Sequence, residues 1–127
     1  MERYIKQRCI ASSIEESDME MLPGTLDVLV LRGLTWGPKH GYAIARWIED
    51  ESGGSLTVLD GALYTALHRM EERGWIAAEW GVSPLGRRAK FYRLTPVGKR
   101  QLQNEAKSWA DYVAAVGSVL RTSTQPG

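Results

Sequence analysis

The sequence predicts a mainly α-helical domain with one small β-hairpin, and three patterns support this fold class. An apolar pattern with helical spacing runs from Leu56 to Met70. Two short segments rich in aromatic and branched residues follow it, on either side of a basic turn. Apolar residues then recur at alternating steps of 4 and 3 towards the C-terminus. Together these patterns are typical of a winged helix-turn-helix domain followed by a C-terminal dimerisation helix.

Composition narrows the class of protein. The chain has 127 residues, of which 43% are hydrophobic and 24% are charged, as expected for one globular domain. No apolar run approaches the roughly 18 residues that a membrane span needs. The first residues lack the apolar stretch of a signal peptide, and Cys9 is the single cysteine, so no internal disulfide can form. We therefore expect a cytoplasmic protein with no membrane partner.

The first third of the chain predicts an extension and a helix. Residues 1–20 show no clear periodicity and mix both charges, so we expect a flexible or weakly helical extension. Either Met19 or Met21 could open the folded part. A first helix should follow, with Thr25 as its N-cap and its end near Trp36. Its apolar stripe consists of Leu26, Leu29, Val30 and Leu34.

A second helix is predicted over residues 41–51, and the glycines at 53 and 54 should end it. We expect His40 to cap or order the turn before this helix. Tyr42 should be half buried against the hairpin or the third helix. The residues that face the core should be Ile44, Ala45 and Ile48.

The third helix should begin at a capping box formed by Thr57 and Asp60, and Gly74 should stop it. Its buried side should consist of Leu59, Ala62, Leu63, Ala66, Leu67 and Met70. The outward side should then present Gly61, Tyr64, Thr65, His68 and Arg69.

Two antiparallel strands are expected next, over residues 75–82 and 90–94, joined by the basic turn 83–88. Thr95 and Pro96 favour a new helix, because threonine caps and proline lacks only an amide that would be unpaired there. This helix should cover residues 96–121 and be followed by a disordered tail, 122–127. Its apolar seam consists of Leu102, Ala106, Trp109, Val113, Val116 and Leu120.

The seam predicts a homodimer. One helix could bury such a seam against its own domain, but about 25 residues extend well beyond what a domain of this size can cover. A second copy of the chain is the better partner for the part that extends beyond the domain.

The distribution of charge predicts double-stranded DNA as a partner. The formal net charge is only +1, but residues 83–100 hold six basic residues and no acidic one. A local concentration of this kind suits phosphate binding, whereas a merely solvated face usually mixes signs. Residues 21–95 are therefore expected to form a DNA-binding domain. The expected DNA contacts are Gly61, Tyr64, Thr65 and His68 on the third helix, with Arg87, Arg88 and Lys90 on the wing.

Other functional classes fit less well. Two histidines and one distant cysteine offer no plausible metal spacing, and no nucleophile elbow or phosphate-binding loop is present. We therefore expect no metal, no cofactor and no enzyme activity. The main alternative is a winged-helix module that binds protein and not DNA, which would be expected to carry a neutral wing and an exposed apolar patch.

The chain also resembles the PadR-like transcriptional regulators over residues 22–120. The resemblance rests on five stretches: LPGTLD (22–27), GPKHGYAI (37–44), GALY with LHRME (61–71), GWI (74–76) and RAKFYRLT (88–95). It implies a dimeric winged-helix repressor that binds an inverted-repeat operator and pairs through its C-terminal helix. Tyr64 matches the family's recognition-helix tyrosine, whereas Ala62 stands where relatives usually have serine or threonine.

The resemblance raises one further expectation about a ligand. In the multidrug-binding branch of this family, a tryptophan of the dimerisation helix stacks on planar ligands between the subunits. Trp109 lies at the matching distance from the Leu-Thr pair that opens the helix. A small aromatic effector is therefore one expectation for Trp109, and simple packing in the seam is the other.

Overall fold

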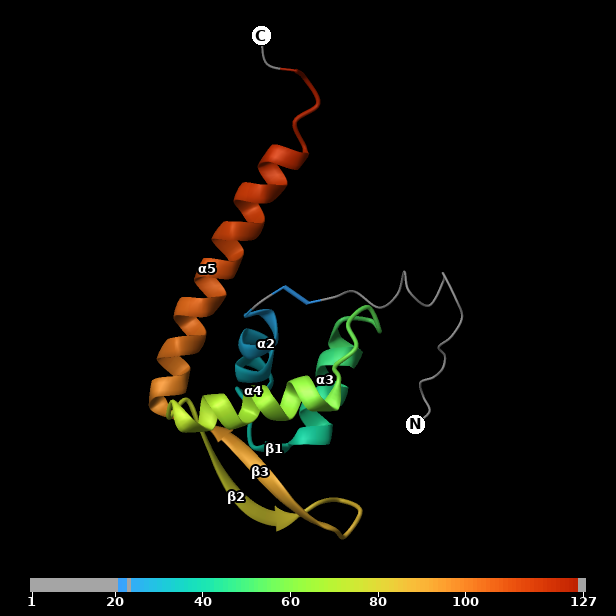
Figure 1. Cartoon of the computed structure of the whole chain (residues 1–127), viewed down its shortest axis with the longest axis vertical. Helices are drawn as coiled ribbons and strands as arrows, with labels where there is room; N and C mark the ends of the chain where they lie inside the picture. Colours follow the sequence, from blue (N-terminus) through green and yellow to red (C-terminus); the bar gives the residue numbers. More distant parts are fainter. Residues whose placement is uncertain (1–20, 23, 126–127) are drawn as a thin grey trace.

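The computed structural model describes residues 21–22 and 24–125, and the expected extension 1–20 lies outside them. Its elements are α2 (Thr25–Gly33), β1 (Lys39–His40), α3 (Gly41–Glu51), α4 (Asp60–Glu72), β2 (Ile76–Val82), β3 (Arg88–Leu94) and α5 (Pro96–Leu120). Figure 1 shows three short helices packed together above the sheet, with α5 leaving the domain at one side. The predicted fold class is confirmed: most of the described chain is helical, and the sheet is small.

The start of α2 differs from the expected cap. Gly24 is the N-cap, with a φ of 87°, and Thr25 is the first helical residue. Only glycine adopts this left-handed conformation without strain. Thr25 is buried, and its hydroxyl has no hydrogen-bond partner among the described residues. The predicted Thr25 cap is therefore wrong, because glycine already turns the chain into the helix and the threonine side chain faces inward.

The buried face of α2 is also rotated from the expected stripe. Val28 and Leu31 are buried, whereas Leu26 and Leu29 are only partly covered. The helix ends at Gly33, three residues before Trp36. The predicted positions Val30 and Leu34 are buried as expected.

The second helix matches its prediction. α3 covers Gly41–Glu51, and its buried residues include the three predicted apolar ones. His40 is the N-cap, and its Nδ1 accepts a hydrogen bond from the Ala43 amide at 3.3 Å. The expectation for Tyr42 is wrong: its side chain is 67% exposed and stacks on the His40 ring, with 6.5 Å between centroids.

The recognition-helix candidate α4 begins later than expected. Its N-cap is Leu59, which has no side-chain cap, so the predicted capping box at Thr57 is wrong. Leu59 is 68% exposed, and Ala62 is also exposed, contrary to the prediction that they face the core. The first turn of α4 extends past the core and lines an open hollow beside the start of α2. The other four predicted apolar positions are buried: Leu63, Ala66, Leu67 and Met70.

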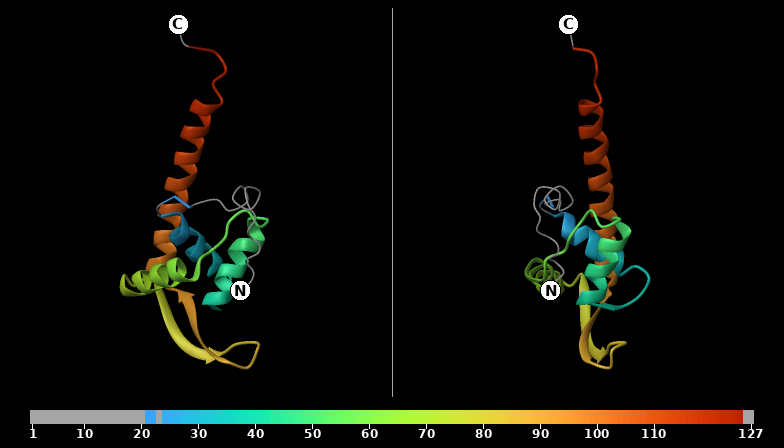
Figure 2. Two further views of the ribbon diagram at one scale, coloured as in Figure 1. Left: turned by 45° about the vertical axis from the view of Figure 1, so that its right-hand side comes forward. Right: turned by 90° about the vertical axis from the view of Figure 1, so that its right-hand side faces the viewer.

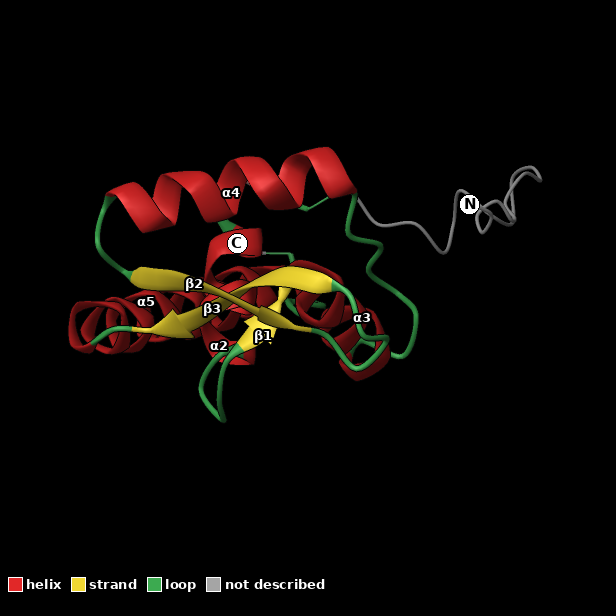
Figure 3. Ribbon diagram, turned by 90° about the horizontal axis from the view of Figure 1, so that it is seen from below, coloured by secondary structure: helices red, strands yellow, loops and turns green. Residues whose placement is uncertain are grey.

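Three antiparallel strands form the sheet, in the order β1-β3-β2. The hairpin β2–β3 is the expected wing. β3 begins at Arg88, two residues earlier than predicted, because Arg88 pairs with Val82. The two-residue strand β1 was not predicted; it pairs Lys39 with Tyr92. Figure 3, seen from below, shows the sheet beside α4, and Figure 1 shows the β2–β3 hairpin extending below that helix.

The last helix begins as predicted and then leaves the domain. Thr95 caps α5 by accepting a hydrogen bond from the Gly98 amide at 3.0 Å, and Pro96 occupies the first turn. The early part of α5 lies against α2, and the two views of Figure 2 show its later part standing clear of the domain. Its 25 residues correspond to a length of about 37 Å. None of the described helices is both long and apolar enough to cross a lipid bilayer.

Candidate nucleic-acid interface

The outward face of α4 carries the predicted polar residues. Gly61, Thr65 and His68 are exposed, and Tyr64 is 50% exposed. A Cβ built on Gly61 would meet nothing within 4 Å, so this part of the helix is open for close approach. His68 forms an ion pair with Glu72 at 3.2 Å when it is protonated. This face of α4 is thus polar and exposed, and Gly61 leaves its N-terminal end without a projecting side chain.

Tyr64 is held by contact with α3. A Cβ built on Gly41 would lie only 2.5 Å from the Tyr64 hydroxyl oxygen, so glycine at this position leaves room for the tyrosine ring. The ring therefore lies against the first residue of α3, while half of its surface stays exposed. This contact fixes the orientation of Tyr64 before any partner binds.

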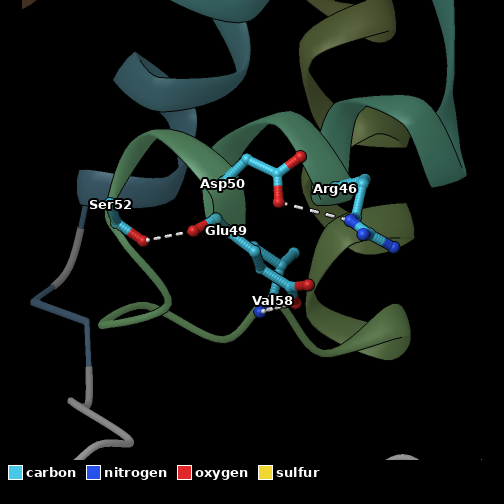
Figure 4. A network of polar contacts seen from close by, with 5 residues as sticks. All are labelled: Arg46, Glu49, Asp50, Ser52 and Val58. Carbon is cyan, nitrogen blue, oxygen red and sulfur yellow. Dashed lines mark hydrogen bonds and ion pairs between the residues drawn. The ribbon is translucent and has the colours of Figure 1, made fainter.

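The loop between α3 and α4 is tied to α3 by the polar network of Figure 4. The Glu49 carboxylate accepts a hydrogen bond from the Val58 amide at 3.1 Å. The Ser52 hydroxyl donates to the Glu49 carbonyl at 3.0 Å and accepts from the Leu56 amide at 3.1 Å. These bonds fix where the chain enters α4. Because two of them use backbone amides of the loop, they hold the position of α4 relative to α3.

Arg69 differs from its prediction. It was expected on the outward side, but its guanidinium forms an ion pair with Asp27 of α2, whose side chain is only 13% exposed. This contact joins α4 to the first turn of α2. Arg69 is therefore a structural residue in the described chain, because a nearly buried carboxylate needs a cationic partner.

Three basic residues of the wing, Arg87, Arg88 and Lys90, differ in what their side chains contact. Arg87 is exposed and forms no ion pair within the described part of the chain. The Arg88 guanidinium lies 4.4 Å from the centroid of the Trp80 ring. Lys90 forms an ion pair with Glu71 of α4 at 3.4 Å. Arg87 and Arg88 are thus available to a phosphate, whereas Lys90 first has to leave Glu71.

The electrostatics favour an anionic partner along the wing and the start of α5. Arg93, Lys99 and Arg100 are exposed in addition to the wing tip arginines. Beneath them, burial raises the pKa of the Tyr92 hydroxyl, and the charge of Glu71 adds to this effect. A tyrosine hydroxyl is neutral at pH 7 even without this shift, so Tyr92 adds no negative charge to the wing.

The seam residues of α5 fall into two groups. Leu102 is partly buried and packs against the domain's own core. The later positions are exposed in the single chain: Trp109 is 37% exposed, Val113 49%, Val116 38% and Leu120 78%. Ala106 is exposed as well. Trp109 also lines a hollow of about 340 Å³ between α5 and the start of α2.

Sequence reasoning missed two aromatic residues that belong to this surface. Tyr42 lies exposed at the N-terminus of α3, next to Gly41, which lies against Tyr64 of α4. Trp80 is 58% exposed on β2 and supports Arg88. The register that pairs Trp80 with Lys90 places it on the same side of the hairpin as Tyr92. A large ring three residues before the basic turn was the available signal for Trp80. In the parts that the structure describes, no three His, Cys, Asp or Glu residues gather as a metal site.

A polar helix face held beside a basic hairpin defines the class of a winged-helix transcriptional regulator. Comparison with known proteins agrees with this class. Residues 30–104 match the family described as transcriptional regulator PadR-like. Uncharacterized protein X of Lysinibacillus sphaericus is 30% identical over 92 residues, which is 72% of this chain and 84% of that protein.

Solved structures show the same likeness. A PadR family transcriptional regulator from Eggerthella lenta is 32% identical, with a TM-score of 0.66 over 78% of this chain and 84% of its own. A PadR-like regulator from Bacillus cereus is 26% identical, with a TM-score of 0.69 over 82% of this chain and 99% of its own. This chain belongs to the PadR-like family of transcriptional regulators.

Proposed function

We propose that the chain is a cytoplasmic, sequence-specific repressor that binds an inverted-repeat operator as a homodimer. The observation that supports this most strongly is the combination of an exposed polar face on α4 with a wing that carries exposed arginines. In this model α4 lies in the major groove, where Tyr64, Thr65 and His68 approach base edges. Gly61 allows the helix to come close, and the wing arginines contact phosphates.

The rigid placement of α4 supports this role. Base recognition requires that a helix keep its position while it enters the groove. α4 is fixed on three sides: by the Glu49 bonds to the preceding loop, by the Arg69–Asp27 ion pair with α2, and by the Lys90–Glu71 ion pair with the wing.

The exposed half of α5 supports a homodimer. Beyond Trp109, apolar residues at heptad spacing line a helix that stands clear of the domain. Exposed apolar side chains at this spacing are the form of a two-helix interface, in which a second α5 covers them. Two DNA-binding domains held together in this way bind two half-sites at once, which multiplies weak individual affinities.

The dimer is tested with a charge in the seam. Val113→Glu should shift sedimentation towards monomer and abolish operator binding, because a buried carboxylate without a partner is costly. Ala115→Glu is the matched control, since it puts the same charge on the other side of the helix. If Val113→Glu remains dimeric and binds DNA normally, the proposed interface is wrong.

DNA recognition is tested on duplexes that the wild-type protein selects from a randomised 40-base-pair pool. Tyr64→Ala or His68→Ala should weaken binding to the selected duplex by about 1–3 kcal/mol, and binding to random DNA much less. Arg87→Ala and Arg88→Ala should weaken binding to both DNAs alike and lower the salt slope by about 1 each. Failure to select any duplex would support the alternative, a winged-helix module that binds protein.

We also propose an effector site at Trp109, because a specific hollow supports it. The rings of Trp109 and Tyr112 lie 6.0 Å apart at a tilt of 34°, and both line the hollow between α5 and α2. Aromatic and apolar walls suit a planar aromatic compound. Binding there would move α5 relative to the domain, and thereby change the spacing of the two recognition helices.

The effector site is tested by fluorescence titration with a panel of acridines and planar phenols. Trp109→Ala should lose binding, and a ligand that binds should release the selected duplex. Quenching that persists in Trp109→Ala, or tight binding with unchanged DNA affinity, would reduce Trp109 to a packing residue of the seam.

A further inference from the structure

The tip of the wing carries an apolar side chain that the proposed DNA contacts leave unused. Leu85 is 85% exposed, which is the highest value among the exposed large hydrophobic residues that the structure describes. Val82 and Trp80 on the same hairpin are 70% and 58% exposed. Single exposed leucines are common on protein surfaces. The position and rigidity of Leu85 are therefore the features that matter.

Hydrogen bonds close the turn that presents Leu85. The Gly86 amide donates to the Ser83 carbonyl at 2.8 Å, and the Ser83 amide donates to the Arg87 carbonyl at 2.7 Å. The Arg87 amide also donates to the Ser83 hydroxyl at 3.3 Å. Pro84 restricts the first central residue of this turn, and Gly86 takes a φ of 80° after it. Leu85 is thus held at the end of a stiff hairpin.

Cations surround this apolar tip. Arg87 and Arg88 follow within three residues, and Arg88 is held against Trp80. No acidic residue occurs between positions 83 and 100. A protein-docking tip would be expected to lack this one-sided charge, whereas an apolar residue between phosphate-binding arginines suits the minor groove of DNA.

We propose that Leu85 is a wedge that enters the minor groove next to each half-site and partly unstacks one base step there. Apolar side chains inserted in this way kink DNA towards the major groove. Pyrimidine–purine steps unstack most easily, so Leu85 confers a preference for such a step at a fixed distance from the bases that α4 contacts. This inference rests on the proposed DNA binding and adds a specificity-determining residue to it.

The experiment compares Leu85→Ala with two controls on duplexes selected by the wild-type protein. Leu85→Ala should bind about 10-fold more weakly, because the apolar burial of the wedge is lost. The salt slope should stay unchanged, since no phosphate contact is removed. Arg87→Ala should instead lower that slope by about 1. Val82→Ala, which shortens an exposed apolar residue in the strand, should change affinity by less than about 2-fold.

DNA bending supplies the second measurement. End-to-end energy transfer in a doubly labelled duplex should show a smaller bend with Leu85→Ala than with the wild type, and Leu85→Met should restore it. A new selection with Leu85→Ala should lose the pyrimidine–purine preference outside the half-sites. Equal affinity and equal bend for wild type and Leu85→Ala would overturn the proposal.

The failure of this inference is distinguishable from failure of the proposed function. If the wild-type protein selects no duplex, DNA binding itself is wrong. If it selects one and Leu85→Ala behaves as the wild type, only the wedge is wrong. Because Leu85 is exposed, Leu85→Ala should unfold at the same urea concentration as the wild type. If Leu85→Ala no longer dimerises in the absence of DNA, the wing tip contacts a second copy of the chain. That result would also overturn the proposal.

Discussion

Replacing Gly98 with alanine would test how firmly α5 is fixed to the winged domain. Gly98 is buried in the first turn of α5, and a Cβ built there would lie 1.9 Å from the carbonyl oxygen of Trp75. Carbon and carbonyl oxygen in contact stay at least about 3.3 Å apart. The two backbone segments would therefore have to separate by about 1.4 Å, and no side-chain rotation can relieve this.

The cost follows from the contacts that this shift would break. Overpacking of a close contact costs about 1–3 kcal/mol. The Thr95 amide donates to the same Trp75 carbonyl at 3.1 Å, and losing that bond costs about 1 kcal/mol more. Alanine is better than glycine in a helix by up to about 1 kcal/mol, which partly offsets the loss. We expect Gly98→Ala to lower the free energy of unfolding by about 2 kcal/mol.

The assay is urea unfolding at one fixed protein concentration, since the stability of the proposed dimer would depend on concentration. Gly117→Ala is the matched control in the same helix. A Cβ at Gly117 would meet only the guanidinium of Arg121, at 2.7 Å, and that exposed side chain can move away. Gly117→Ala should therefore be as stable as the wild type or slightly more so. If the two variants agree within about 0.5 kcal/mol, the close contact at Gly98 has been misjudged.

Three further predictions test the contacts that hold the site together. Glu49→Ala should lower the free energy of unfolding by about 1 kcal/mol in urea titrations. Glu49→Gln should lower it much less, because an amide oxygen can still accept the hydrogen bond from the Val58 amide. Equal losses for the two variants would contradict the role of this hydrogen bond. Asp27→Ala should cost about 1–2 kcal/mol in the same assay by leaving Arg69 without its partner, and no loss would show that the ion pair is dispensable. Burial raises the pKa of Tyr92 above its ordinary value, so the unfolded chain releases this proton first. The stability that Tyr92 contributes is complete below about pH 10 and is lost as the pH rises further, so Tyr92→Phe should lose less stability than the wild type in alkaline unfolding curves; parallel curves would contradict it.

Local signals in the sequence predicted the parts of the fold that depend on neighbouring residues. α3, the cap at Thr95 and the hairpin follow from short-range patterns, and the structure confirms them. The polar face of α4 followed from helical spacing in the same way. The other two predicted hydroxyl caps, at Thr25 and Thr57, were wrong. Thr25 was assigned a cap that Gly24 makes unnecessary, and α4 begins three residues after Thr57.

The remaining features depend on residues that are far apart in the chain. β1 has only two residues and exists because β3 lies beside it. Arg69 lies on a helical position that the pattern places outward, but Asp27, 42 residues earlier, is folded against it. Lys90 pairs with Glu71 for the same reason. A helical pattern gives the direction of a side chain, and only the packing of the elements shows which charged residue is already paired.

The most direct test of the account is a hydroxyl-radical footprint of the wild-type protein on a duplex that it has selected. We expect two protected regions related by two-fold symmetry, with centres about one helical turn of DNA or a whole number of turns apart. Added protection should occur in the flanking minor grooves, where the wings lie. A single protected region without symmetry would contradict the dimer, and protection that is equal on selected and random DNA would contradict recognition of bases by α4.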